Sequence, residues 1–206
     1  MRFTLSALLL ALLAPLPGQA QDTTVPPVAA LVLDWNQDAA PDAVWLTRGS
    51  EHSADVHIRM GGADGPHPVL TIPGAVYFGS WIGQAPGLEA LTDTSFAMTS
   101  EQTGHGPTPW MARVTVAFRN GGLMVTGYSH DYYDRLDPEH WGSCDVNLLT
   151  GEVRLSQGPG TGEIRDSDTP LDAPETQQTL HFAPAPFALT DLTDGYFPTA
   201  CEALYH

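Results

Sequence analysis

The sequence VTVAFRNGGLMVTGY, residues 114–128, contains two alternating apolar stretches joined by a turn signal. Val114, Val116 and Phe118 are spaced two residues apart, so in a strand they share one face. Asn120 and Gly121 supply the pair of positive φ angles that a type I′ turn requires. The stretch therefore predicts a tight antiparallel β-hairpin.

Short apolar or alternating runs, separated by Gly, Pro, Asn and Asp, occur along the rest of the chain. Its 206 residues include 20 Gly and 18 Pro, and punctuation of this kind is typical of all-β proteins. No window keeps a 3.6-residue apolar period over three turns, so we expect little helix. The predicted fold class is all-β, a single sandwich-like or open barrel-like antiparallel domain. Its strands are expected at residues 29–33, 43–47, 54–60, 69–72, 75–78, 111–118, 123–132, 145–149 and 152–156.

Residues 1–20 have the pattern of a secretory signal peptide. Arg2 precedes an apolar run from Leu5 to Leu16, and small residues occupy positions −3 and −1 of a cut after Ala20. The alternative, a membrane anchor, needs about 20 apolar residues, and this run is shorter. We therefore expect a periplasmic or secreted protein with no membrane insertion after cleavage.

The remaining residues 21–206 are expected to form one β-rich domain, a length that suits a single core. Residues 21–28 are predicted to be an extended lead-in. Residues 157–174, rich in Gly, Pro, Asp, Ser and Thr, are predicted to form a long flexible loop.

The formal net charge is −16, with eight arginines and no lysine. Such a surface repels phosphate backbones and anionic lipid headgroups, so nucleic acid and membrane surfaces are poor partners. Cations suit it better, although solubility alone also explains the acidity. The partner, if macromolecular, is expected to be an unidentified protein or glycan.

Cys144 and Cys201 are the two cysteines of the chain, and in an exported protein an even number predicts a disulfide. Closing a loop of about 58 residues stabilises by roughly 4 kcal/mol in the chain-entropy model. The alternatives are a metal pair or a catalytic thiol, for which neither CxxC spacing nor an adjoining His is present.

The loop DWNQDAAPD, residues 34–42, places oxygen-bearing side chains at its positions 1, 3, 5 and 9. Alternate residues of a tightly wound loop converge, and the carbonyl at position 7 adds another oxygen, which suits Ca²⁺. The alternative is an acidic turn with Asx-type caps and no ion. Trp35, within this loop, is expected to be exposed. The predicted calcium ligands are Asp34, Asn36, Asp38, the Ala40 carbonyl and Asp42.

This loop resembles the calcium loop of FG-GAP or VCBS-type repeats over residues 31–48. The resemblance implies that the four oxygen-bearing side chains carry the ion between two strands. An EF-hand would need Glu at position 12, where this chain has Trp45. The family usually has Gly at position 6, where a left-handed conformation is wanted, and this chain has Ala39 in a single copy of the loop.

A second candidate site is the polar aromatic stretch from Tyr128 to Trp141. In a strand, alternate residues from Tyr128 to Tyr132 face one side and those from Ser129 to Tyr133 face the other. Aromatic rings beside carboxylates are used by sugar-binding surfaces and by glycosidases, in which Asp131 with Asp134 or Glu139 would act as acid and base. The possible ligand surface comprises Tyr128, His130, Asp131, Tyr132, Asp134 and Trp141.

No nucleophile elbow and no closely spaced histidine ligands occur, so no catalytic residue is assigned. The sequence favours a non-enzymatic binding or structural module with one calcium loop. The alternative is a small periplasmic glycan hydrolase or a carbohydrate-binding domain that uses the Tyr128–Trp141 stretch.

Overall fold

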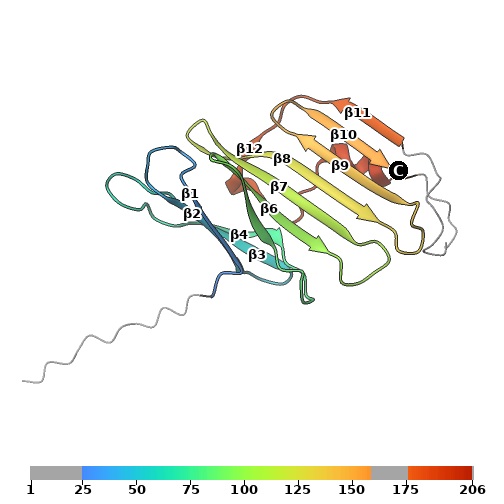
Figure 1. Cartoon of the computed structure of the whole chain (residues 1–206), viewed down its shortest axis with the longest axis horizontal. Coiled ribbons are helices and arrows are strands. Elements are labelled where there is room, and N and C mark those ends of the chain that lie inside the picture. Colours follow the sequence, from blue (N-terminus) through green and yellow to red (C-terminus); the bar gives the residue numbers. More distant parts are fainter. Residues whose placement is uncertain (1–24, 159–175, 206) are drawn as a thin grey trace, which may run out of the picture.

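The computed structural model describes residues 25–158 and 176–205, which form two antiparallel β-sheets (Figure 1). The smaller sheet has the order β1-β2-β3-β4, and the larger has the order β11-β10-β9-β8-β7-β6-β5, with β12 paired to β8. These sheets and two short 3-10 helices confirm the predicted all-β sandwich. The elements are β1 (Ala29–Leu33), β2 (Asp42–Arg48), β3 (Ser53–Arg59), β4 (Leu70–Tyr77), β5 (Gly87–Thr92), β6 (Ser95–Gln102), β7 (Trp110–Arg119), β8 (Gly122–Tyr133), β9 (Trp141–Asn147), β10 (Glu152–Gln157), β11 (Thr176–His181), β12 (Phe187–Ala188), η1 (Leu189–Asp191) and η2 (Thr199–Tyr205).

The hairpin predicted from residues 114–128 is formed by β7 and β8. Arg119 pairs with Gly122, and the two residues between them have φ angles of 53° at Asn120 and 80° at Gly121. The predicted turn is thus confirmed. A register shift between Thr115 and Val116 adds one residue to β8, a β-bulge that increases the local twist.

Strands that the sequence pattern missed lie at edges or carry polar residues. β11 is exposed along nearly its whole length, so no alternation of apolar residues marks it. β6 instead buries Phe96, Ala97 and Met98 in succession, which also hides the period of two. The runs predicted at 69–72 and 75–78 are one strand, β4, which passes through Gly74 at a φ of 57°.

The core lies between the smaller sheet and one face of the larger sheet. Strand β1 contacts β5, and β4 contacts β6, so the smaller sheet covers the β5–β8 end. Residues 189–205, here called the C-terminal segment, include η1 and η2. Through these two helices the segment contacts β8, β9 and β10, and in Figure 1 it lies behind the larger sheet. The largest fully buried side chains include Trp35, Leu46, Phe96 and Met98.

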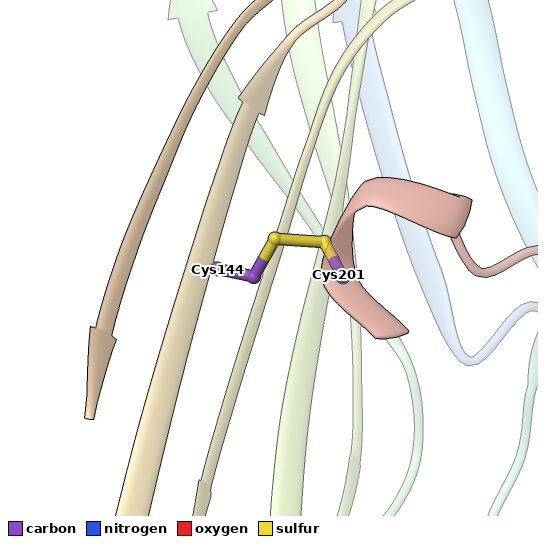
Figure 2. The surroundings of a disulfide bond; sticks show 2 residues. All are labelled: Cys144 and Cys201. Carbon is purple, nitrogen blue, oxygen red and sulfur yellow. A yellow bond between two sulfur atoms is a disulfide. The ribbon is translucent and has the colours of Figure 1, made fainter. Parts of the chain in front are cut away.

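A disulfide joins Cys144 of β9 to Cys201 of η2, with a Cα–Cα distance of 5.6 Å (Figure 2). Both cysteines are fully buried. This confirms the predicted pairing. Because Cys144 is paired with His130 in the sheet, η2 is fixed over the face that the His130 side chain occupies.

The predicted signal peptide, residues 1–20, lies outside the described residues. So do residues 21–24 of the lead-in and residues 159–174 of the predicted loop. The first residue of that predicted loop, Gln157, is the last residue of β10. Within residues 25–158 and 176–205, no helix is long and apolar enough to cross a lipid bilayer.

Candidate functional site

The loop between β1 and β2 is held by its own side chains. The Asp34 carboxylate accepts the backbone N–H groups of Asp38 at 3.0 Å and Ala39 at 2.9 Å. Asp38 accepts the N–H of Ala40 at 2.8 Å, and its other oxygen accepts an N–H of the Asn36 side chain at 2.9 Å. These are the Asx-type contacts of a tight acidic turn, and they bring the first three predicted ligands together.

Asp42 stands apart from these three residues because it is fully buried. Its Oδ2 accepts the N–H of Trp35 at 2.9 Å, and its Oδ1 accepts the N–H of Gly61 at 2.8 Å. Both carboxylate oxygens therefore bond backbone donors inside the protein. A Cβ at Gly61 would lie 2.6 Å from the Pro41 oxygen, so only glycine permits this close approach.

Trp35 is fully buried, so the expectation that it is exposed is wrong. Its ring lies 5.1 Å from that of Phe96 on β6. The hydrogen bond from the backbone N–H of Trp35 to Asp42 turns the chain inward at the start of the loop. The indole consequently fills space between the two sheets instead of facing solvent.

The backbone of the loop has a left-handed residue at the position where the FG-GAP type of loop usually has Gly. Ala39 has a φ of 69°, and Gln37 has a φ of 59°. Left-handed backbone costs a non-glycine residue about 1–2 kcal/mol. Among the described residues, no three His, Cys, Asp or Glu side chains are grouped as a metal site. The occupancy of the loop by Ca²⁺ thus stays a prediction.

The second predicted site is divided between the two faces of the larger sheet. Tyr128, His130 and Tyr132 are buried on the inner face, whereas Asp131 is exposed on the outer face. Trp141 is paired with Tyr133, so it also belongs to the outer face. The six residues therefore form no single ligand surface.

Asp134 has a structural contact in the turn that follows β8. Its Oδ1 accepts the N–H of Leu136 at 2.7 Å, and its Oδ2 lies 3.8 Å from Nδ1 of His140.

Tyr132, on the inner face, donates its hydroxyl to the Leu204 carbonyl at 3.1 Å. This bond fastens the C-terminal helix η2 to β8.

A cavity of about 450 Å³ lies between the two sheets and the C-terminal segment. Val76 of β4 and Met98 of β6 are buried and form its floor. Asp194 and Glu202, in the C-terminal segment, are exposed and mark its mouth. The backbone N–H of Asp194 donates to the Gly74 carbonyl at 3.0 Å, which joins this segment to β4.

Aromatic rings make a continuous wall around the cavity. The Tyr77 ring lies 5.1 Å from Trp110, and Trp110 lies 5.9 Å from His130. His130 in turn lies 5.1 Å from Phe197, with the two rings nearly perpendicular at 88°. Tyr128 meets Phe197 at 5.9 Å and 83°. The wall thus runs from the smaller sheet, across β7 and β8, to the C-terminal segment.

Among the residues that the structure describes, His130 is the one basic residue that lines the cavity. Burial lowers the pKa of His130, and the charge of Asp131 opposes part of this shift. The imidazole is therefore neutral near neutral pH. Burial likewise raises the pKa of Tyr196, which keeps its hydroxyl protonated.

The chain is similar to none of the protein families, curated proteins and solved structures that were compared with it. The arguments for the loop between β1 and β2 and for the cavity therefore use only the residues of this chain.

The sequence identified Tyr128 and His130 but missed the rest of the cavity lining. Tyr77, Trp110 and Phe197 come from three distant parts of the chain and meet only when the sheets pack. A local signal did exist near the C-terminus, because Tyr196 and Phe197 stand a few residues before Cys201. The disulfide predicted there would bring this aromatic pair onto the face occupied by His130.

Proposed function

We propose that this protein is an exported, non-enzymatic binding module whose cavity between the sheets holds a small molecule with an apolar body. The observation that carries the proposal is the cavity of about 450 Å³, which is rich in aromatic residues and whose lining surface is mostly apolar. Small-molecule sites are typically concave, largely apolar and of this size. The module would act in the periplasm or outside the cell, where the predicted signal peptide and the disulfide fit.

A glycan hydrolase receives less support from the geometry. Such an enzyme needs two carboxyl groups facing one concave site. Asp131 lies on the outer face, Asp134 bonds the turn after β8, and Glu139 is buried away from the cavity lining. A carbohydrate-binding surface made of the whole Tyr128–Trp141 stretch is disfavoured for the same reason.

The loop between β1 and β2 is proposed to bind Ca²⁺ as a structural ion. The left-handed φ of Ala39 and the convergence of Asp34, Asn36 and Asp38 support this role. Asp42 would then hold the end of the loop through its buried hydrogen bonds, or it would give up one of its two backbone hydrogen bonds and bind the ion. The ion would stabilise the first hairpin and would have no catalytic role.

The binding function is tested with N-phenylnaphthylamine, a neutral dye that fluoresces in apolar pockets. The purified protein should bind it saturably with one site per chain. Ala112→Phe places a ring into the cavity from β7 and should abolish binding, whereas Ala90→Phe, on β5 and outside the lining, should not. Absence of saturable binding, or equal binding by both variants, would refute a ligand in the cavity.

A further inference from the structure

The charges around the cavity have one sign. Its lining includes the carboxylates Asp194 and Glu202 at the mouth and contains none of the six arginines in the described part of the chain. The arginines of the described residues lie outside the cavity lining, and several of them have partners elsewhere: Arg48 lies over Phe78, Arg113 pairs with Glu89 and Arg154 pairs with Glu152. A ligand that enters therefore passes two negative charges and, among the residues that the structure describes, meets no fixed positive charge.

The rings below the mouth are arranged as a cage. Tyr128 is perpendicular to Tyr196 at 89° and to Phe197 at 83°, and it is parallel to His130 at 5°. Trp110 is tilted by 57° from Tyr77. Walls that stand at several angles can surround a rounded group. Ring faces carry negative electrostatic potential, and an ammonium group within about 6 Å of them is attracted.

His130 does not interrupt this pattern. Its ring lies between Trp110 and Phe197, and burial lowers its pKa, so it contributes a neutral ring at neutral pH. The net charge of −16 adds a long-range field that attracts cations and repels anions. Anionic ligands, such as fatty acids or phosphate esters, are therefore disfavoured even though the cavity has an apolar floor.

We infer that the ligand of this cavity is an organic cation, an ammonium group carried on an apolar body. The inference rests on the binding function proposed above. The ammonium group would lie against the cavity side of the wall that Trp110, His130 and Phe197 form, and its charge would be balanced by Asp194 and Glu202 at the mouth. Inorganic cations lack the apolar body that would fill the remaining volume.

Displacement of the bound dye tests this inference with two probes of the same shape. Benzyltrimethylammonium carries the charge, and neopentylbenzene replaces its nitrogen with carbon. We expect the cation to displace the dye at a concentration about tenfold lower than the neutral probe, from ring and carboxylate attraction together. Equal displacement by the two probes would overturn the inference and leave the binding function standing. Failure of the dye itself to bind would overturn both.

Variants assign the effect to the residues named. Trp110→Leu keeps an apolar side chain but removes a ring face, and it should weaken binding of the cation about tenfold while changing binding of the neutral probe less. The pair Asp194→Asn and Glu202→Gln should weaken the cation about threefold and spare the neutral probe. Glu51→Gln removes an exposed charge outside the cavity and is the matched control. The inference fails if this control weakens the cation as much as the mouth variants do.

Discussion

Oδ2 of Asp42 accepts the backbone N–H of Trp35 at 2.9 Å, and neither residue is exposed to solvent. The bond joins the two ends of the acidic loop from the inside. Asp42, chosen from the sequence as an ion ligand, is therefore also the residue that fixes how the loop enters and leaves the core.

Replacing Asp42 should cost more stability than replacing any exposed acid of the loop. Asp42→Ala leaves the N–H groups of Trp35 and Gly61 buried without their acceptor, and we expect the free energy of unfolding to fall by about 3 kcal/mol. Asp38→Ala, at an exposed position, should cost about 1 kcal/mol or less. Urea unfolding in calcium-free buffer measures both. Similar losses in the two variants would mean that the buried bonds contribute little.

Millimolar calcium should raise the melting temperature of the wild type. A ligand that binds only the folded state stabilises it by about 2.7 kcal/mol at 100 times its Kd, and extracellular calcium modules commonly bind at about 10⁻⁴ to 10⁻³ M. Asp38→Ala should lose this rise. Ala39→Gly, which relieves the left-handed backbone, should keep it and melt higher without calcium. If wild type and Asp38→Ala respond alike, the loop is an acidic turn without an ion.

Loss of the disulfide should destabilise the fold substantially. Replacing Cys144 and Cys201 by Ala opens a link between residues separated by 57 positions, for which the chain-entropy model gives about 4 kcal/mol. The free energy of unfolding measured in urea should fall by about that amount. A thiol titration of the unfolded, unreduced wild type should detect no free thiol, and two reactive thiols would contradict the pairing.

Lowering the pH should decrease the free energy of unfolding through protonation of His130. Burial lowers the pKa of this residue below its ordinary 6.5, so below about pH 6.5 the unfolded chain binds a proton more readily than the folded one. The stabilisation is complete above that pH and is lost as the pH falls toward the folded-state pKa. His130→Phe keeps a ring between Trp110 and Phe197 but does not titrate. Its unfolding free energy should fall less steeply than that of the wild type from pH 7.5 to 5, and parallel curves would exclude this role.

Local chemistry explains which parts of the fold could be predicted. The β7–β8 hairpin was predictable because Asn120 and Gly121 meet the backbone demand of the turn by themselves. The disulfide was predictable because the chain offers only one pair. Trp35 was misjudged because a loop residue carries no sign that the chain turns inward beneath it. The cavity escaped prediction because Tyr77, Trp110 and Phe197 meet only through the packing of two sheets and a C-terminal segment.

Cys201, which forms the disulfide with Cys144, is adjacent in the chain to Glu202, which lines the cavity. The hydrogen-bond ladders of both sheets are complete without η2, whereas one wall of the cavity is carried by the C-terminal segment that the disulfide fastens to β9. In a chain whose thiols are reduced, this wall would be held by non-covalent contacts such as the Tyr132–Leu204 and Asp194–Gly74 hydrogen bonds. Under the binding function proposed above, oxidation of Cys144 and Cys201 would be the step that fixes this wall of the binding site on β9.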